Sequence, residues 1–165
     1  MRRIAIVGFA LLAASPLAAH PEGAHAPATQ AKSAHDQDQA AVRSVLQQYK
    51  AAIERLDARG TERLFATDSA IFETGGVEGN YANYLAHHLT PELAEFKSFR
   101  FSNYKIEVTF VGPVALATES YAYRIETKKG EVAERLGVAT SVLTRVGGSW
   151  KILSMHNSAR RPKAL

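Results

Sequence analysis

The chain has 165 residues, enough for one domain with its own apolar core, and 46% of them are hydrophobic. It contains no cysteine, which excludes disulfide bonds and lipid attachment at a cysteine. The formal net charge of +4 falls to +2 if Arg2 and Arg3 leave with an N-terminal signal. The basic cluster that remains, at residues 160–163, is typical of a solvated tail and does not favour nucleic-acid binding.

The first residues have the pattern of a secretory signal peptide. Arg2 and Arg3 form a basic start, residues 4–17 are mostly apolar, and small residues end at Ala19. The apolar stretch is shorter than the roughly 20 residues that a membrane helix needs. We therefore expect a signal peptide at 1–19, a periplasmic or secreted protein, and no membrane association after cleavage.

A change of composition follows the expected cleavage point. Residues 20–36 are rich in Ala, His and Pro and show no periodic apolar pattern, which predicts a disordered tether. The domain itself is expected to span residues 37–163. If cleavage exposes His20, its α-amine and imidazole could chelate copper, and this stays a separate hypothesis.

The predicted domain begins with an amphipathic helix. Apolar residues recur at three-and-four spacing from Val42 to Leu56, and a short helix through Leu64 and Phe65 is expected next. Ala70–Thr74 then has the composition of a strand. A further helix is expected at 81–96, bent or split where Thr90 and Pro91 interrupt its pattern.

The rest of the sequence predicts long strands joined by hairpin turns. Apolar side chains change parity between Phe101 and Tyr104, which predicts a bulge near Ser102 and Asn103. Successive hairpins indicate a curved antiparallel sheet with the helices on its concave side, an α+β fold. One face of the second long strand is expected to carry Ala115, Ala117, Glu119, Tyr121, Tyr123 and Ile125.

The order helix, helix, strand, helix and curved strands, ending in WKILSMHNS, resembles the nuclear transport factor 2-like superfamily and its SnoaL-like branch. The resemblance covers about Ala40 to Arg160. It implies a cone-shaped α+β roll in which a curved antiparallel sheet wraps the N-terminal helices around a ligand cavity. It also implies a homodimer that pairs through the sheet.

The resemblance also bears on chemistry. The segment QQYKAAIERLD is similar to the part of ketosteroid isomerase that carries an oxyanion-stabilising tyrosine, which places Tyr49 at that position. The same comparison puts Thr74 where the isomerase has its aspartate base, and a regular strand would turn Glu73 to the opposite face. Isomerase-type catalysis is therefore disfavoured, and whether the protein is an enzyme is left open.

Three functions remain open for the polar residues of such a cavity. The first is binding of a small, largely apolar ligand without a cofactor. The second is an isomerase, lyase or cyclase beside a carbonyl, with His88 or His156 as base and Tyr49 as oxyanion donor. The third is an envelope protein that binds zinc or copper through His88, Glu92 and His156. The predicted pocket consists of Tyr49, Phe72, Tyr84, His88, Tyr123 and His156.

Overall fold

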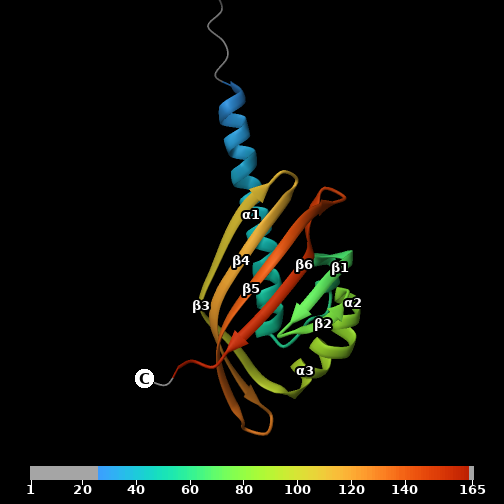
Figure 1. Cartoon of the computed structure of the whole chain (residues 1–165), viewed down its shortest axis with the longest axis vertical. Helices are drawn as coiled ribbons and strands as arrows, with labels where there is room; N and C mark the ends of the chain where they lie inside the picture. Colours follow the sequence, from blue (N-terminus) through green and yellow to red (C-terminus); the bar gives the residue numbers. More distant parts are fainter. Residues whose placement is uncertain (1–25, 164–165) are drawn as a thin grey trace, which may run out of the picture.

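The computed structural model describes residues 26–163, and their side chains from residue 34 onward. Helix α1 (Ala26–Glu54) is the longest element, and its N-terminal part extends beyond the sheet (Figure 1). The structure thus differs from the predicted tether at residues 26–36, where alanine, glutamine and lysine favour a helix. His35 already packs against Phe110, with ring centroids 4.9 Å apart. The predicted signal peptide and residues 20–25 lie outside the described residues.

Short elements follow α1 before the long strands begin, as the sequence predicts. The helix expected at 81–96 is split into an α-helical turn, a π-helical segment and a second α-helix. None of the helices in the described part of the chain could cross a membrane. The elements are η1 (Thr61–Leu64), β1 (Phe65–Glu73), β2 (Gly76–Gly79), α2 (Tyr81–Tyr84), η2 (Leu85–Leu89), α3 (Thr90–Glu95), β3 (Phe96–Val111), β4 (Val114–Thr127), β5 (Val132–Val146) and β6 (Ser149–Arg160).

The strands form one six-stranded sheet in the order β2-β1-β6-β5-β4-β3. All neighbouring pairs are antiparallel except β1 and β6, which run parallel. The last strand therefore lies inside the sheet, between an early strand and β5. Figure 1 shows α1 running behind the long strands, with α2 and α3 beside β1 and β2. The predicted α+β fold with a curved sheet is confirmed.

Two irregularities set which side chains face the helices. The β3–β4 register shifts between Ser102 and Lys105, and Asn103 has φ 53°, so the predicted bulge is confirmed. A second shift lies in β6, where Ile152 pairs with Leu143 but Ser154 pairs with the adjacent Val142 of β5. Because of this extra residue in β6, each side chain that follows it lies on the opposite face of the sheet from the one that regular alternation would give.

The core lies between α1 and the sheet. Val42 of α1, Ile71 of β1, Leu143 of β5 and Ile152 of β6 are all fully buried, and Leu46 joins them in the same apolar cluster. The apolar stripe of α1 thus packs on the middle of the sheet. Toward the C-terminal end of α1, aromatic and polar side chains replace this aliphatic core.

Candidate functional site

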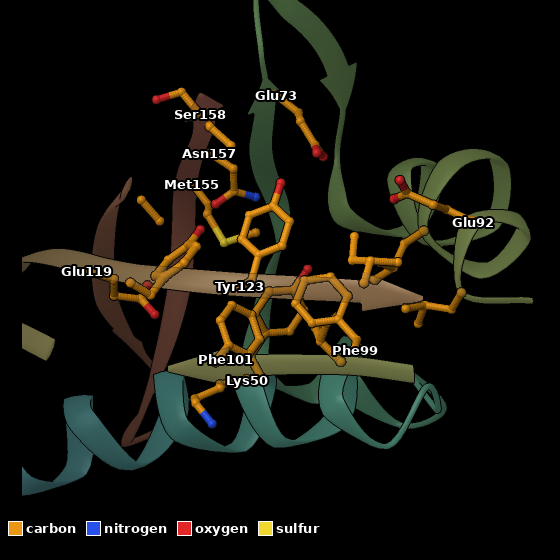
Figure 2. A pocket seen from close by; sticks show the side chains of 18 of the residues that line it. Lys50, Glu73, Glu92, Phe99, Phe101, Glu119, Tyr123, Met155, Asn157 and Ser158 are labelled. Atoms are coloured by element: carbon orange, nitrogen blue, oxygen red, sulfur yellow. The ribbon is translucent and has the colours of Figure 1, made fainter. Parts of the chain in front are cut away.

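A cavity of about 130 Å³ lies between the C-terminal part of α1, the helical segment 84–93 and the concave face of the sheet. Figure 2 shows its lining side chains converging from α1, the end of β1, α3 and the long strands. The lining includes five tyrosines, three phenylalanines and three glutamates. The site is therefore an aromatic cavity with a small number of carboxyl groups.

The aromatic wall comes from β3 and β4. Phe99 stacks on Tyr123 with ring centroids 5.1 Å apart, and Phe101 meets Tyr121 edge to face at 5.0 Å. The bulge in β3 brings Tyr104 onto the same face, where its ring lies 6.0 Å from Tyr121. The change of parity at the bulge thus extends the aromatic wall by one residue.

Gly137 of β5 gives Tyr121 the space for its ring. The two residues are register partners, and a Cβ atom built on Gly137 would lie 2.2 Å from Cε2 of Tyr121. The tyrosine ring therefore occupies the space that any other residue at position 137 would need for its side chain. The shape of this wall depends on a glycine outside the cavity lining.

Glu119 is the buried carboxyl group of the site. It is only 7% exposed, and its Oε1 accepts a hydrogen bond from the Tyr104 hydroxyl. Burial raises the pKa of Glu119, and the bond from Tyr104 only partly opposes this effect. Glu119 therefore holds its proton to a higher pH than an exposed glutamate.

We predict that Glu119→Gln makes the protein more stable than wild type at about pH 8, with the difference shrinking toward pH 4. A raised pKa means that folding favours the protonated form, so the wild type loses stability as pH rises through that pKa. Thermal unfolding of both proteins across this range measures the difference. Glu107→Gln, at an exposed position of β3, is the control. A lower Tm for Glu119→Gln at the higher pH would contradict the prediction.

Lys50 is the basic residue in the described cavity lining. Its Nζ lies 2.7 Å from Oε2 of Glu54, and it sits 5.2 Å and 5.3 Å from the ring centroids of Phe101 and Tyr104. Burial alone would raise the pKa of Glu54, but the bond from Lys50 and a backbone bond from Phe101 lower it. Lys50 and Glu54 therefore form a charged pair beside the aromatic wall.

A second polar group lies at the end of β1. The Tyr84 hydroxyl donates a 2.6 Å hydrogen bond to Oε2 of Glu73, and the side chains of Glu73 and Glu92 point toward one another (Figure 2). His88 Nε2 lies 3.9 Å from Glu73 and 3.8 Å from Glu92, while its Nδ1 lies 3.1 Å from Glu78. We name Glu73, Glu78, Tyr84, His88 and Glu92 the β1-end cluster.

The pKa values in this cluster follow from the same contacts. Burial would lower the pKa of His88, but the bond to Glu78 and the charges of Glu73 and Glu92 outweigh it, so the pKa is raised. The pKa of Glu92 is raised by burial and by the charge of Glu73. The cluster therefore favours a protonated histidine among the carboxyl groups.

The structure brings together only part of the predicted pocket. Tyr49, Tyr84 and Tyr123 line the cavity, and burial raises the pKa of Tyr49 well above its ordinary value. His88 belongs to the β1-end cluster but does not line the cavity.

Phe72 and His156 differ from the prediction, because both lie outside the cavity lining. Their rings meet edge to face with centroids 6.3 Å apart, and Phe72 alternates with the buried Ile71. In β6 the extra residue after Ile152 turns Met155 inward, so that His156 is exposed.

Glu73 also differs from its expected place. It lies on the same face of β1 as the buried Ile71 and lines the cavity, whereas a regular strand with Thr74 facing inward predicts that it faces outward. The inward position of Thr74 was implied by the resemblance to the isomerase. Thr74 does border the cavity, but it does so because the strand ends there with φ 45°. A carboxyl group is therefore present one residue before the position assigned to the base.

The predicted metal ligands are not brought to one point. Glu92 lies near His88, but His156 lies outside the cavity lining that includes Glu92. Among the described residues, no group of three or more His, Cys, Asp or Glu side chains has the geometry of a metal site.

The sequence prediction missed Glu119, Lys50 and Tyr104. A signal for Glu119 was present, since a glutamate interrupts an otherwise apolar or aromatic strand face that includes Ala117 and Tyr121. Lys50 gave no such signal, because a lysine beside an apolar helix stripe is usually solvated.

A curved sheet that packs against a long helix and leaves a cavity between them defines a class of small α+β ligand-binding and enzyme folds. The sequence profile of the SnoaL-like domain matches residues 42–162, and the chain belongs to this family. The resemblance seen in the sequence is thereby confirmed. No curated protein matches the chain.

Solved structures share the fold. A proposed dehydratase of the NTF2-like family from Streptomyces avermitilis is 20% identical, with a TM-score of 0.67, covering 77% of this chain and 99% of its own. A proposed ketosteroid isomerase from Shewanella frigidimarina is 27% identical, with a TM-score of 0.60 and coverages of 72% and 94%. A proposed scytalone dehydratase from Novosphingobium aromaticivorans is 14% identical, with a TM-score of 0.69 and coverages of 78% and 88%.

Proposed function

We propose that the protein binds a small, largely apolar molecule in the cavity beneath α1. The observation that carries this proposal is the cavity itself, about 130 Å³ in volume and walled by Phe99, Phe101 and Tyr123. A cavity of about 150 Å³ in another protein holds benzene, so a single ring is the matching size here. The hydroxyl and carboxyl groups of the lining can orient such a ligand.

Binding of single-ring probes tests the proposal. We expect benzene, phenol or benzyl alcohol to show saturation transfer from the protein by NMR. Ala139→Leu should abolish this transfer, because Ala139 is buried in the lining and leucine would fill the cavity. Thr140→Leu is the matched control, since this neighbouring residue of β5 is exposed. No transfer from the wild type to any of these probes would refute the proposal.

A second candidate function is acid–base catalysis on the bound molecule. The observation that favours it is Glu73, which lines the cavity and is hydrogen-bonded to Tyr84, with His88 3.9 Å away. A carboxylate here could remove a proton beside a carbonyl while Tyr49 stabilises the resulting negative charge. The dehydratase and isomerase descriptions of the structural neighbours support this candidate.

We predict that Glu73→Gln lowers the rate of α-proton exchange of cyclohexanone in D₂O by about 10²–10⁴-fold relative to the wild type. Glutamine keeps the shape of the side chain but cannot accept the proton. NMR of the ketone measures exchange, and Glu107→Gln on the outside of β3 should retain the full rate. Equal rates for wild type and Glu73→Gln would remove this candidate.

We further propose that the protein is exported and acts in the periplasm or outside the cell. The support is the basic, apolar and small-residue pattern of residues 1–19. Cell fractionation followed by mass spectrometry of the N-terminus tests this. Finding the intact chain in the cytosolic fraction would contradict export.

A homodimer through the outer face of the sheet is also proposed. Its support is the resemblance together with three exposed apolar residues of β4 and β5, which are Leu116, Leu136 and Val138. Sedimentation equilibrium of the wild type and of Val138→Lys tests it. A monomeric wild type would contradict it.

A further inference from the structure

We propose that the molecule bound in the cavity is an organic cation, a small amine whose ammonium group pairs with Glu119 while its apolar body lies against the aromatic wall. This inference rests on the proposed ligand-binding function and adds the chemical class of the ligand. It depends on the charged groups that line the cavity, on the burial of Glu119 and on the aromatic wall beside it.

The cavity lining carries more acidic than basic groups. Glu73, Glu92 and Glu119 contribute three carboxyl groups, whereas Lys50 contributes the basic group within the described lining. Lys50 is already paired with Glu54 at 2.7 Å, and Glu54 does not line the cavity. Among the described residues, the charge of Lys50 is therefore paired with a carboxylate outside the cavity and not with any of the three carboxyl groups of the lining.

Two of these three carboxyl groups share one basic neighbour, His88. His88 lies 3.9 Å from Glu73 and 3.8 Å from Glu92. For Glu119, the described part of the chain provides no basic nitrogen within the 4.0 Å of an ion pair. Its one hydrogen-bond partner among the described residues is the hydroxyl of Tyr104, which accounts for Oε1 only.

A buried carboxyl group without a cation is costly to a protein in its ionised form. Glu119 is 7% exposed, and buried charges are found with a partner in most proteins. Without a ligand the group can hold a proton instead, in keeping with its raised pKa. An ammonium group entering the cavity would take the place of that proton as the partner of the carboxylate.

The aromatic wall is suited to a cation as well. Lys50 Nζ lies 5.2 Å from the ring centroid of Phe101 and 5.3 Å from that of Tyr104, within the range of cation–π attraction. Tyr121 stands next to Glu119 on the same face of β4 and continues this wall. An ammonium beside Glu119 would therefore lie next to the aromatic wall as well as the carboxylate.

The test compares two probes that differ in charge and little in shape. Benzylamine is protonated near neutral pH, as alkylamines are, while benzyl alcohol is neutral. Isothermal titration of the full-length protein with each probe gives the two Kd values. We expect benzylamine to bind at least about tenfold more tightly, which corresponds to about 1.4 kcal/mol.

Two variants then test whether Glu119 is the carboxyl group that pairs with the ammonium. Glu119→Gln should remove the preference for benzylamine while still binding benzyl alcohol, and this retained binding shows that the variant is folded. Glu107→Gln removes an exposed charge of β3 and should keep the full preference.

Each outcome decides between the two proposals. Equal binding of the two probes, or a preference for the alcohol, would overturn the cation inference and leave the ligand-binding function standing. A preference for the amine that survives in Glu119→Gln would also overturn the inference. Binding of neither probe would overturn it together with the proposed function.

Discussion

Ile152→Ala is expected to lower the free energy of unfolding by about 2–5 kcal/mol. Ile152 is fully buried in β6, where it pairs with Leu143 on one side and with Phe65 on the other. Truncation leaves a cavity at the point where β1, β5 and β6 meet, and close-packed neighbours cannot fill it. Chemical denaturation of both proteins measures the loss.

Val77→Ala provides the control for this truncation. Val77 is 80% exposed on β2, so removing its methyl groups should change the free energy of unfolding by no more than about 0.5 kcal/mol. If Ile152→Ala cost as little as Val77→Ala, the placement of Ile152 in the buried core would be wrong.

Gly137→Ala is expected to destabilise the protein by about 1–3 kcal/mol, although alanine is the smallest possible addition. Its Cβ would lie 2.2 Å from Cε2 and 2.9 Å from Cδ2 of Tyr121, so the ring must move. Because Tyr121 is part of the aromatic wall, the shape of the cavity changes as well. Denaturation measures the first effect, and the Kd of the single-ring probes measures the second.

A double-mutant cycle isolates the steric cause. In a Tyr121→Ala background the ring is gone, so Gly137→Ala should cost nothing or stabilise the strand, because glycine is a poor strand residue. An equal cost in both backgrounds would show that position 137 needs glycine for a reason other than the tyrosine ring.

Local patterns in the sequence were sufficient to predict the main features of the fold. The parity change between Phe101 and Tyr104 predicts the bulge in β3, and the structure shows the register shift there. The interruption at Thr90 predicts the split helix, which is observed. Both signals are contained in a few neighbouring residues, and this is why they could be found without a structure.

The site was harder to predict, because the face of the sheet on which a side chain lies depends on how its strand pairs with the neighbouring strand. The extra residue of β6 after Ile152 is visible only in the pairing with β5, and it moves His156 out of the predicted pocket. For Glu73, counting from the buried Ile71 gives the observed face, whereas counting from Thr74 gives the wrong one.

The position of β6 also has a consequence for the order of folding. Phe65 at the start of β1 pairs with Ile152 of β6, so β1 meets this inner neighbour only after β3, β4 and β5 have been made. Such contacts between distant parts of a chain are slow to form. A growing chain that stops before β6 can pair β3, β4 and β5 with one another and β1 with β2, but the strand that joins these two groups is missing. Closure of the sheet is therefore a late event, completed after the ribosome has made residues 149–160.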